Sequence, residues 1–273
     1  MILIFIGFPV AFSLFGVAVL FGYMRFGDVL VHQLIAKVDD VASYYVLSAV
    51  PLFIFMGCML EKSGVSEKLF EAVHLVTRKL PGGLAISTVV LCVFFAAASG
   101  VVGAAESVVG LMVISVMLRH GYDKGLISGT ICAGGSLGTI IPPSVVVVIL
   151  SPIAGVGVGN LFVGIMFPGL ILAGLYIVYI LLRCSIWPED GPSVDNGESY
   201  GSIASQTWVV FSSLVPLFGL IFSVLGTIML GWATPTEAGA MGAIGTIILT
   251  ILYRTFNWVL LKGAFLKALR VTA

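Results

Sequence analysis

Three glycines and two adjacent prolines interrupt a long apolar stretch of the chain, in the sequence GGSLGTIIPPS at residues 134–144. Proline has no amide hydrogen, and its ring clashes with the preceding helical turn. The glycines relax the backbone just before the prolines. The sequence therefore predicts a helix over 125–150 that breaks near the middle of a membrane and leaves backbone carbonyl and amide groups free.

A broken membrane helix could bind an ion or a small solute. Carbonyl oxygens are suitable ligands for a desolvated Na⁺, and the N-termini of half-helices attract anions. A simple proline kink that packs against a neighbouring helix is the alternative. We favour the binding site because the sequence predicts a second break in SGVVGAAES, at residues 99–107.

Glu106 follows this second break inside an apolar stretch. A carboxylate at membrane depth costs about 2.5–3.5 kcal/mol on insertion scales, so it normally has a partner or a function. Glu106 could take up a proton or help to hold a cation. Alternatively, it could cap the free amides in the first turn of the helix that follows the break.

A third polar feature, ATPTEAG at residues 233–239, has the pattern of a helix start. Thr234 or Thr236 could be the capping residue, with Pro235 at the first helical position and Glu237 in the first turn. Capping accounts for the whole pattern. The alternative is a polar contact of Thr236 and Glu237 near a transport path.

These features lie among apolar segments that are long enough to cross a membrane. The chain has 273 residues, of which 59% are hydrophobic and 10% charged, whereas soluble domains contain about 25% charged residues. About 20 apolar residues span a hydrocarbon core of about 30 Å. The composition predicts an all-α polytopic membrane protein with apolar segments at 1–24, 44–60, 83–98, 101–118, 125–150, 160–182, 208–231 and 238–253.

The sequence contains none of the common signatures of enzymes or of ATP-driven pumps. We find no phosphate-binding loop, dinucleotide fingerprint, zinc-protease motif or nucleophile elbow. The four cysteines and three histidines are scattered, without metal-ligand spacing. We therefore expect no enzymatic activity, no cofactor and no nucleic-acid partner.

Basic residues suggest how the chain crosses the membrane, because cytoplasmic loops are enriched in lysine and arginine. Such residues gather in 61–82 and 119–124, at Arg183, and after residue 253, whereas 151–159 carries no charge. With the basic stretches in the cytoplasm, 83–123 fits a re-entrant hairpin that enters and leaves on the cytoplasmic side. The amphipathic stretches 65–80 and 256–270 fit helices at the membrane surface.

The back part of the chain, after a polar linker at 184–207, repeats the plan of the front part: a span at 238–253 is followed by the surface helix 256–270. By charge the second copy has the opposite orientation, which is typical of inverted-repeat secondary transporters. The second copy would lack its own hairpin and broken helix. We therefore expect the chain to be incomplete at its C-terminal end.

Seven segments, in this order, resemble the large membrane (permease) subunit of the tripartite ATP-independent periplasmic (TRAP) transporters. The resemblance covers nearly the whole chain, and the combination is specific. The segments are PLFIFMG (51–57), LPGGLA (80–85), SGVVGAAESVVG (99–110), GYDKG (121–125), GGSLGTIIPPS (134–144), NLFVGIMFPGL (160–170) and ATPTEAG (233–239).

The resemblance implies a secondary-active importer of small organic acids in the bacterial inner membrane. It implies coupling to Na⁺, with H⁺ as the alternative ion, and two partners besides the lipid bilayer: a small membrane subunit and a soluble periplasmic substrate-binding protein. Transport in this family is of the elevator type. A channel, another type of secondary transporter and a non-functional fragment remain the alternatives.

Carried onto this chain, the resemblance assigns a role to each part. The parts are scaffold helices (1–60), a cytoplasmic surface or arm helix (61–82), a first transport repeat (83–182), a polar cytoplasmic linker (184–207) and the start of a second repeat with two spans and a surface helix (208–273). The first repeat contains the hairpin (83–123), the broken helix (125–150) and a further helix (160–182).

The resemblance also implies site residues. Candidates for Na⁺ binding, largely through the backbone, are Ser99, Gly100, Gly103, Ser136, Gly138, Thr139 and Pro142; candidates for substrate binding or coupling are Glu106, Pro143, Ser144, Thr236 and Glu237. At the hairpin, Val101, Val102 and Glu106 depart from the usual family pattern. They resemble the branch associated with mannitol and with chloroaromatic or 2-oxo acids.

Overall fold

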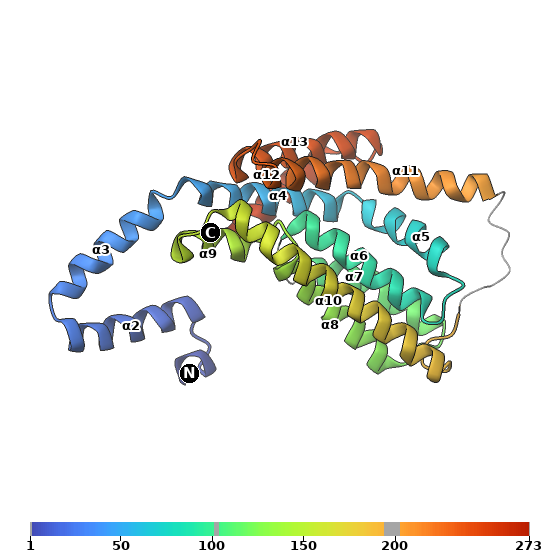
Figure 1. The fold of residues 1–273 in the computed structure, drawn as a ribbon, viewed down its shortest axis with the longest axis horizontal. Helices are drawn as coiled ribbons and strands as arrows, with labels where there is room; N and C mark the ends of the chain where they lie inside the picture. Colours follow the sequence, from blue (N-terminus) through green and yellow to red (C-terminus); the bar gives the residue numbers. More distant parts are fainter. Residues whose placement is uncertain (1, 101–103, 194–202, 273) are drawn as a thin grey trace. The chain divides into compact units, whose positions relative to one another are not determined.

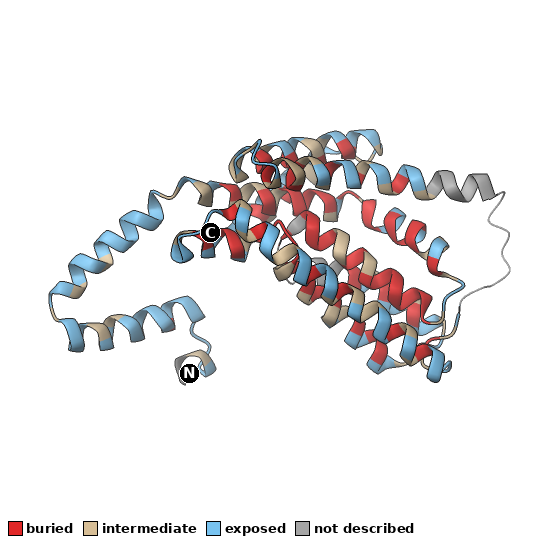
Figure 2. Ribbon diagram, in the orientation of Figure 1, coloured by how far each residue is buried: buried red, intermediate tan, exposed pale blue. Residues whose placement is uncertain are grey.

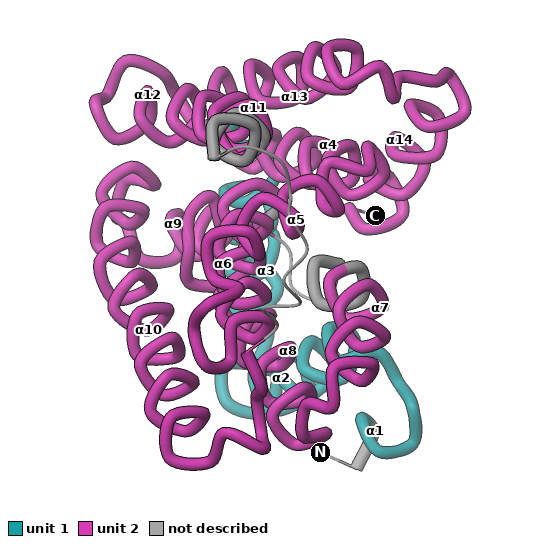
Figure 3. The backbone as a smooth tube through the Cα atoms, turned by 90° about the vertical axis from the view of Figure 1, so that its right-hand side faces the viewer, with its two compact units in different colours: residues 1–45 teal, residues 46–273 magenta. Residues whose placement is uncertain are grey.

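The computed structural model describes residues 2–100, 104–193 and 203–272; for Ser99, 104–108 and 203–209 it describes the backbone alone. These residues form helices and turns and contain no strand, so the all-α prediction is confirmed. The chain divides into two compact units, residues 1–45 and 46–273 (Figure 3).

The first unit consists of α1 (Ile2–Phe5), α2 (Val10–Phe26) and α3 (Val29–Ala42). The apolar segment 1–24 is therefore divided, because Gly7 adopts a φ of 97° and Pro9 precedes α2. Almost every side chain on α2 and α3 is exposed within this unit (Figure 2).

The second unit contains the remaining helices, which are labelled in Figure 1 where space allows. In chain order they are η1 (Tyr45–Ser48), α4 (Ala49–Lys62), α5 (Val65–Thr77), α6 (Gly83–Ser99), α7 (Ala104–Arg119), α8 (Lys124–Ile140), α9 (Val145–Ala154), α10 (Val158–Ile186), α11 (Ile203–Ile221), η2 (Phe222–Gly226), α12 (Thr227–Met229), α13 (Pro235–Leu252) and α14 (Trp258–Thr272).

Helix length separates full spans from shorter pieces. Four described helical stretches are long and apolar enough to cross a membrane: Tyr45–Lys62, Val158–Ile186, Val210–Met229 and Pro235–Leu252. The pair α8 and α9 forms a further span that bends by 40° at its break. The arms α6 and α7, with 17 and 16 residues, are shorter than these spans, as a re-entrant hairpin requires.

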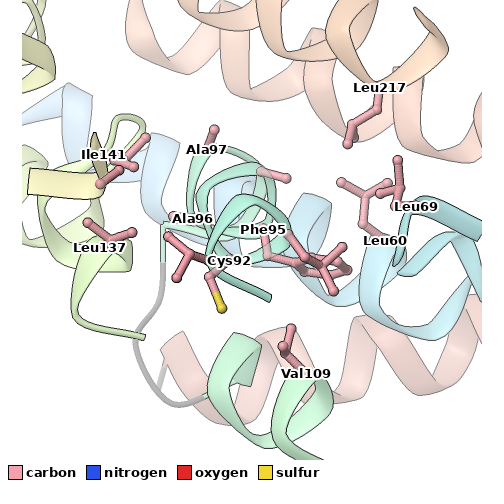
Figure 4. Packing of buried hydrophobic residues seen from close by; sticks show 14 of the residues in the cluster. Leu60, Leu69, Cys92, Phe95, Ala96, Ala97, Val109, Leu137, Ile141 and Leu217 are labelled. Carbon is pink, nitrogen blue, oxygen red and sulfur yellow. The ribbon is translucent and has the colours of Figure 1, made fainter. Parts of the chain in front are cut away.

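The arm α6 is the most deeply buried helix of the second unit (Figure 2). It packs against α4, α5, α8 and α10, and Figure 4 shows side chains of these helices around Cys92 and Phe95. A Cβ added to Gly134 would lie 2.9 Å from the Cβ atom of Cys92. The glycine therefore allows α8 to approach α6 closely, as small residues do between membrane helices.

The polar linker is shorter than the predicted range 184–207, because α10 continues to Ile186 and α11 already begins at Ile203. Pro188 explains the end of α10, since the residue before a proline avoids the helical conformation. The next residues fold back onto neighbouring helix ends. Gly82 N donates to Gly191 O (3.0 Å) and Asp123 N donates to Asp190 O (3.0 Å).

The two amphipathic helices form where the sequence predicts them, as α5 and α14. On α5, Leu69 and Val73 are buried, but Val76 is 65% exposed. On α14 the buried residues are Ala264 and Ala268, whereas Phe265 and Leu269 are exposed. The small face of α14 therefore packs against the protein, and its large apolar side chains remain available to a membrane.

Candidate functional site

The end of the first hairpin arm meets the break in the broken helix. Gly100 ends α6 in the left-handed conformation, with a φ of 60°. A Cβ at this position would collide with the carbonyl oxygen of Pro143 and would lie 3.4 Å from the Cα atom of Ser144. Val145 N, the first amide of α9, donates to Gly100 O over 3.3 Å. Two breaks that are more than 40 residues apart in the sequence thus form one site.

The break itself comprises four consecutive buried residues, 141–144. Ile141 leaves the helical conformation with a ψ of 123°, and the two prolines that follow donate no amide hydrogen bonds. Ser144 precedes α9 in an extended conformation. Its side chain is completely buried, and its Oγ atom has no hydrogen-bond partner among the described residues.

An unpartnered buried hydroxyl is costly, so it normally has a ligand or a water as partner. The last carbonyls of α8 and the first amides of α9 face the same break, because helix ends lack intrahelical partners for these groups. Hydroxyl and carbonyl oxygens are ligands for a hard cation, and free amides favour an anion. The site therefore has the donor set for a desolvated monovalent cation, for a carboxylate, or for both.

The other candidates on α8 have partners inside the protein. Ser136 Oγ donates to Ala133 O (2.7 Å) and lies 3.3 Å from the hydroxyl of Tyr176 on α10. Thr139 Oγ1 donates to Ser136 O (2.8 Å), and Gly138 is buried. Ser136 thus lies against α10, and any ion binding by these residues would use their carbonyl groups.

Three candidates fall partly or wholly outside the described residues. Gly103 lies outside them. The backbones of Ser99 and Glu106 belong to α6 and α7, but their side chains are not described. The role of Glu106 in coupling or in capping therefore stays a prediction.

Thr236 and Glu237 lie on another pair of helices, α13 and the start of α4. The Glu237 carboxylate accepts from Thr234 N (2.8 Å), and Glu237 N donates to Thr234 Oγ1 (3.4 Å), which forms a capping box with Pro235 at its start. Thr236 Oγ1 lies 3.5 Å from Ser48 Oγ. The capping interpretation of this motif is confirmed, with Thr234 as the capping residue.

Tyr176 is a polar residue at this end of α8 that the sequence did not single out. Its hydroxyl lies beside Ser136, and its ring belongs to α10. Within an apolar span, a tyrosine in LAGLYIVYILLR looks like ordinary packing. The signal that could have found it is the need of a buried phenol for a hydrogen-bond partner.

Among the described residues, no three His, Cys, Asp or Glu side chains are close enough to hold a metal ion together. A cation at the break would therefore be held by neutral oxygen atoms. This donor set suits a weakly bound alkali ion better than a transition metal.

Apolar spans, a short-armed hairpin and a broken helix with a buried polar centre define a multi-pass membrane protein of the transporter type. The family model described as "Tripartite ATP-independent periplasmic transporter, DctM component" matches residues 1–273. The chain belongs to this family, which consists of transporters and not of enzymes.

Curated relatives support the same family. The chain is 34% identical over 253 residues to the C4-dicarboxylate TRAP transporter large permease protein DctM of Vibrio cholerae, which covers 91% of this chain and 54% of the relative. It is 33% identical to the protein of the same description from Pseudomonas aeruginosa, over 78% of this chain and 48% of the relative.

A third relative is the isethionate TRAP transporter permease protein DctMQ of Oleidesulfovibrio alaskensis, with 29% identity over 92% of this chain and 39% of the relative. The chain thus spans about half the length, or less, of these relatives. Their names do not support the predicted mannitol and chloroaromatic branch, which stays a prediction.

Proposed function

We propose that this chain forms part of the large membrane subunit of a sodium-coupled importer of small organic acids in a bacterial inner membrane. A periplasmic binding protein delivers the substrate, and a small membrane subunit completes the assembly. The printed functions of the relatives, C4-dicarboxylate and isethionate transport, favour small anionic substrates.

One observation carries the proposal: Gly100 lies against Pro143 and Ser144, so both breaks in the apolar chain meet at a buried polar point. A lipid-facing anchor has no need of such a point. In the proposed transporter, Ser144 Oγ and the nearby carbonyl groups hold Na⁺, and the amides at the start of α9 face the organic acid. Binding of the cation offsets the negative charge of the substrate.

Sodium binding can be measured without knowing the substrate. We expect NaCl to raise the melting temperature of the purified chain above that in KCl of equal ionic strength. Binding about tenfold above the dissociation constant adds about 1.4 kcal/mol, or roughly 3–6 °C for a chain of this size. Ser144→Ala should remove most of this difference.

Ser128→Ala is the matched control, because Ser128 is an exposed serine on α8 that bonds to Gly125 O of its own helix. In the absence of Na⁺, Ser144→Ala should be as stable as the parent or more stable, since an unpartnered hydroxyl is removed. Equal melting temperatures in Na⁺ and K⁺ would contradict sodium binding at this site.

Transport itself requires the assembled system. The chain, a small membrane subunit and a binding protein from the same genome should take up a C4-dicarboxylate or isethionate into proteoliposomes only with an inward Na⁺ gradient. Glu106→Gln tests proton coupling, because a proton carried by Glu106 would make uptake depend on pH in the parent alone. Ohmic single-channel currents without the binding protein would favour a channel instead.

A further inference from the structure

We propose that the groove between α8 and α10 binds one ethanolamine phospholipid from the cytoplasmic leaflet. The groove has a volume of about 480 Å³, which lies within the range of about 300–1,000 Å³ that is usual for small-ligand sites. Small residues of α8 form one wall: Gly125, Gly129 and Ala133. Leu172, Leu175 and Tyr176 of α10 form the other.

The glycine on the groove wall has no explanation inside the chain. A Cβ added to Gly129 would meet no atom within 4 Å, whereas Gly134 on the same helix is required by the approach of Cys92. Exposed positions on α10, by contrast, carry large apolar residues such as Leu175. Gly129 therefore leaves space for something outside the described chain.

A polar atom within the groove points to a ligand that is not purely hydrocarbon. Thr130 lines the groove and is 4% exposed, and its Oγ1 atom has no hydrogen-bond partner among the described residues. It lies five residues after Gly125, about 7.5 Å deeper along α8. The ester carbonyl groups of a phospholipid lie below its headgroup in the same way, and one of them can accept a hydrogen bond from Thr130.

The mouth of the groove has the charges of a zwitterionic headgroup's counterpart. Tyr179 and Arg183 line the groove and also a second cavity of about 560 Å³, which Trp187 and Asp190 complete. Arg183 Nη1 donates to the Tyr179 hydroxyl (3.2 Å), and Arg183 Nε donates to Asp190 Oδ2 (2.9 Å). The guanidinium and phenol groups can bind a phosphate, and the carboxylate can bind an ammonium group.

The balance of charge selects among phospholipids. Arg183 lies between two carboxylates, those of Asp190 (2.9 Å) and Asp123 (4.0 Å), so the mouth has a net negative charge. This charge disfavours anionic headgroups. An ethanolamine ammonium also donates hydrogen bonds to carboxylates, as a lysine does, whereas the trimethylated nitrogen of choline has no N–H.

The length of the groove fits one leaflet better than a whole transmembrane helix. From Leu172 to Arg183, α10 advances by about 17 Å, close to half of a hydrocarbon core of about 30 Å. The polar groups lie at one end of this length only. Trp187 and Tyr179 at that end match the aromatic residues that mark a membrane interface.

The test uses the purified chain in bilayer nanodiscs that contain phosphatidylethanolamine with a photoreactive acyl chain. We expect peptide mapping to place the adducts mainly on α8 and α10. Gly129→Leu should fill the groove and lower the adduct yield about tenfold, equivalent to the loss of about two buried methylene contacts. Gly164→Leu is the matched control, because Gly164 is an exposed glycine on α10 that also has open space around it.

Two further measurements test the polar contacts. Thr130→Val keeps the side-chain shape and should weaken lipid retention; Asp190→Asn should reduce the preference for ethanolamine over choline and glycerol headgroups in competition. Adducts spread evenly over exposed helices, or yields equal in the parent and Gly129→Leu, would overturn the proposal. Since no transport is measured, this result does not depend on the proposed function.

Discussion

At the scale of single residues, Gly100 and Ser144 define the candidate site for opposite reasons. Gly100 is required because any side chain would overlap the Pro143 carbonyl group. Ser144 is notable because its hydroxyl is buried without a partner, although a protein would be more stable with that group satisfied. A residue that is worse for stability than alanine indicates a ligand.

Gly100→Ala should destabilise the chain strongly, and Gly155→Ala provides the comparison. Both glycines end a helix in the left-handed conformation, with φ values of 60° and 66°, but a Cβ at Gly155 meets no atom within 4 Å. We expect Gly155→Ala to cost about 1–2 kcal/mol from backbone strain alone, and Gly100→Ala to cost more. Chemical denaturation in detergent measures both, and equal losses would contradict the contact with Pro143.

His74 on α5 predicts a pH dependence of stability. Burial lowers the pKa of His74 below its ordinary value of 6.5, with contributions from the nearby His120 and Arg78. The unfolded chain therefore takes up a proton near pH 6.5 that the folded chain takes up only at lower pH. Stability should fall as the pH is lowered from 7 towards 5.

The matched variant for this prediction is His74→Gln, which is neutral at every pH in this range. Its melting temperature should change less between pH 7 and pH 5 than that of the parent. An identical pH profile in both proteins would show that other groups cause the dependence.

At the scale of elements, helix ends carry most of the information in this protein. The end of α6 and the start of α9 share a hydrogen bond at the candidate site. At the other end of these helices, the Tyr122 hydroxyl donates to Pro192 O (3.0 Å) and accepts from Leu84 N (3.2 Å). Burial raises the pKa of Tyr122 to about 12, so its hydroxyl remains a donor at any physiological pH.

An ion pair fixes the surface helix α14 to α4. Lys267 Nζ lies 2.6 Å from Glu61, whose side chain is 15% exposed. Removing one partner leaves a partly buried charge, so Lys267→Gln should cost about 1–3 kcal/mol and increase hydrogen exchange in α14. Lys262→Gln, at an exposed position of the same helix, should change neither; a similar effect of both variants would contradict a specific role of the pair.

At the scale of the whole molecule, the apolar surface is what the bilayer must cover. The exposed faces of α10, α11 and α13 carry large apolar side chains, and the hairpin arm α6 is covered by other helices of the same unit. Helices with apolar outer faces and a buried hairpin are stable only when lipid replaces water around them. The orientation of this unit in the bilayer follows from the basic residues alone and stays a prediction.

Cysteine labelling tests this orientation. Val156→Cys lies in the uncharged connector 151–159, and Lys124→Cys lies in the basic connector 119–124; both positions are exposed. In intact inner-membrane spheroplasts, a membrane-impermeant maleimide should label Val156→Cys and not Lys124→Cys, relative to the parent chain as blank. The reverse pattern would place the hairpin on the periplasmic side.

The sequence by itself determined the helical class, the two breaks and the capping box, because each depends on local chemistry. Twenty apolar residues in a row can only be a membrane helix or a deeply buried one, adjacent prolines must interrupt a helix, and Thr-Pro-Thr-Glu caps its own amides. The positions of α5 and α14 followed from amphipathic spacing in the same way.

Only the tertiary structure decided which of the polar residues meet. It brought Gly100 to Pro143 and Ser144, turned Ser136 towards Tyr176, and left Thr236 and Glu237 at the cap of α13. It also showed that the small face of α14 is the buried one and that Arg183 lies between two carboxylates. Such contacts join residues far apart in the chain, and the packing of whole helices, which local sequence does not encode, sets their distances.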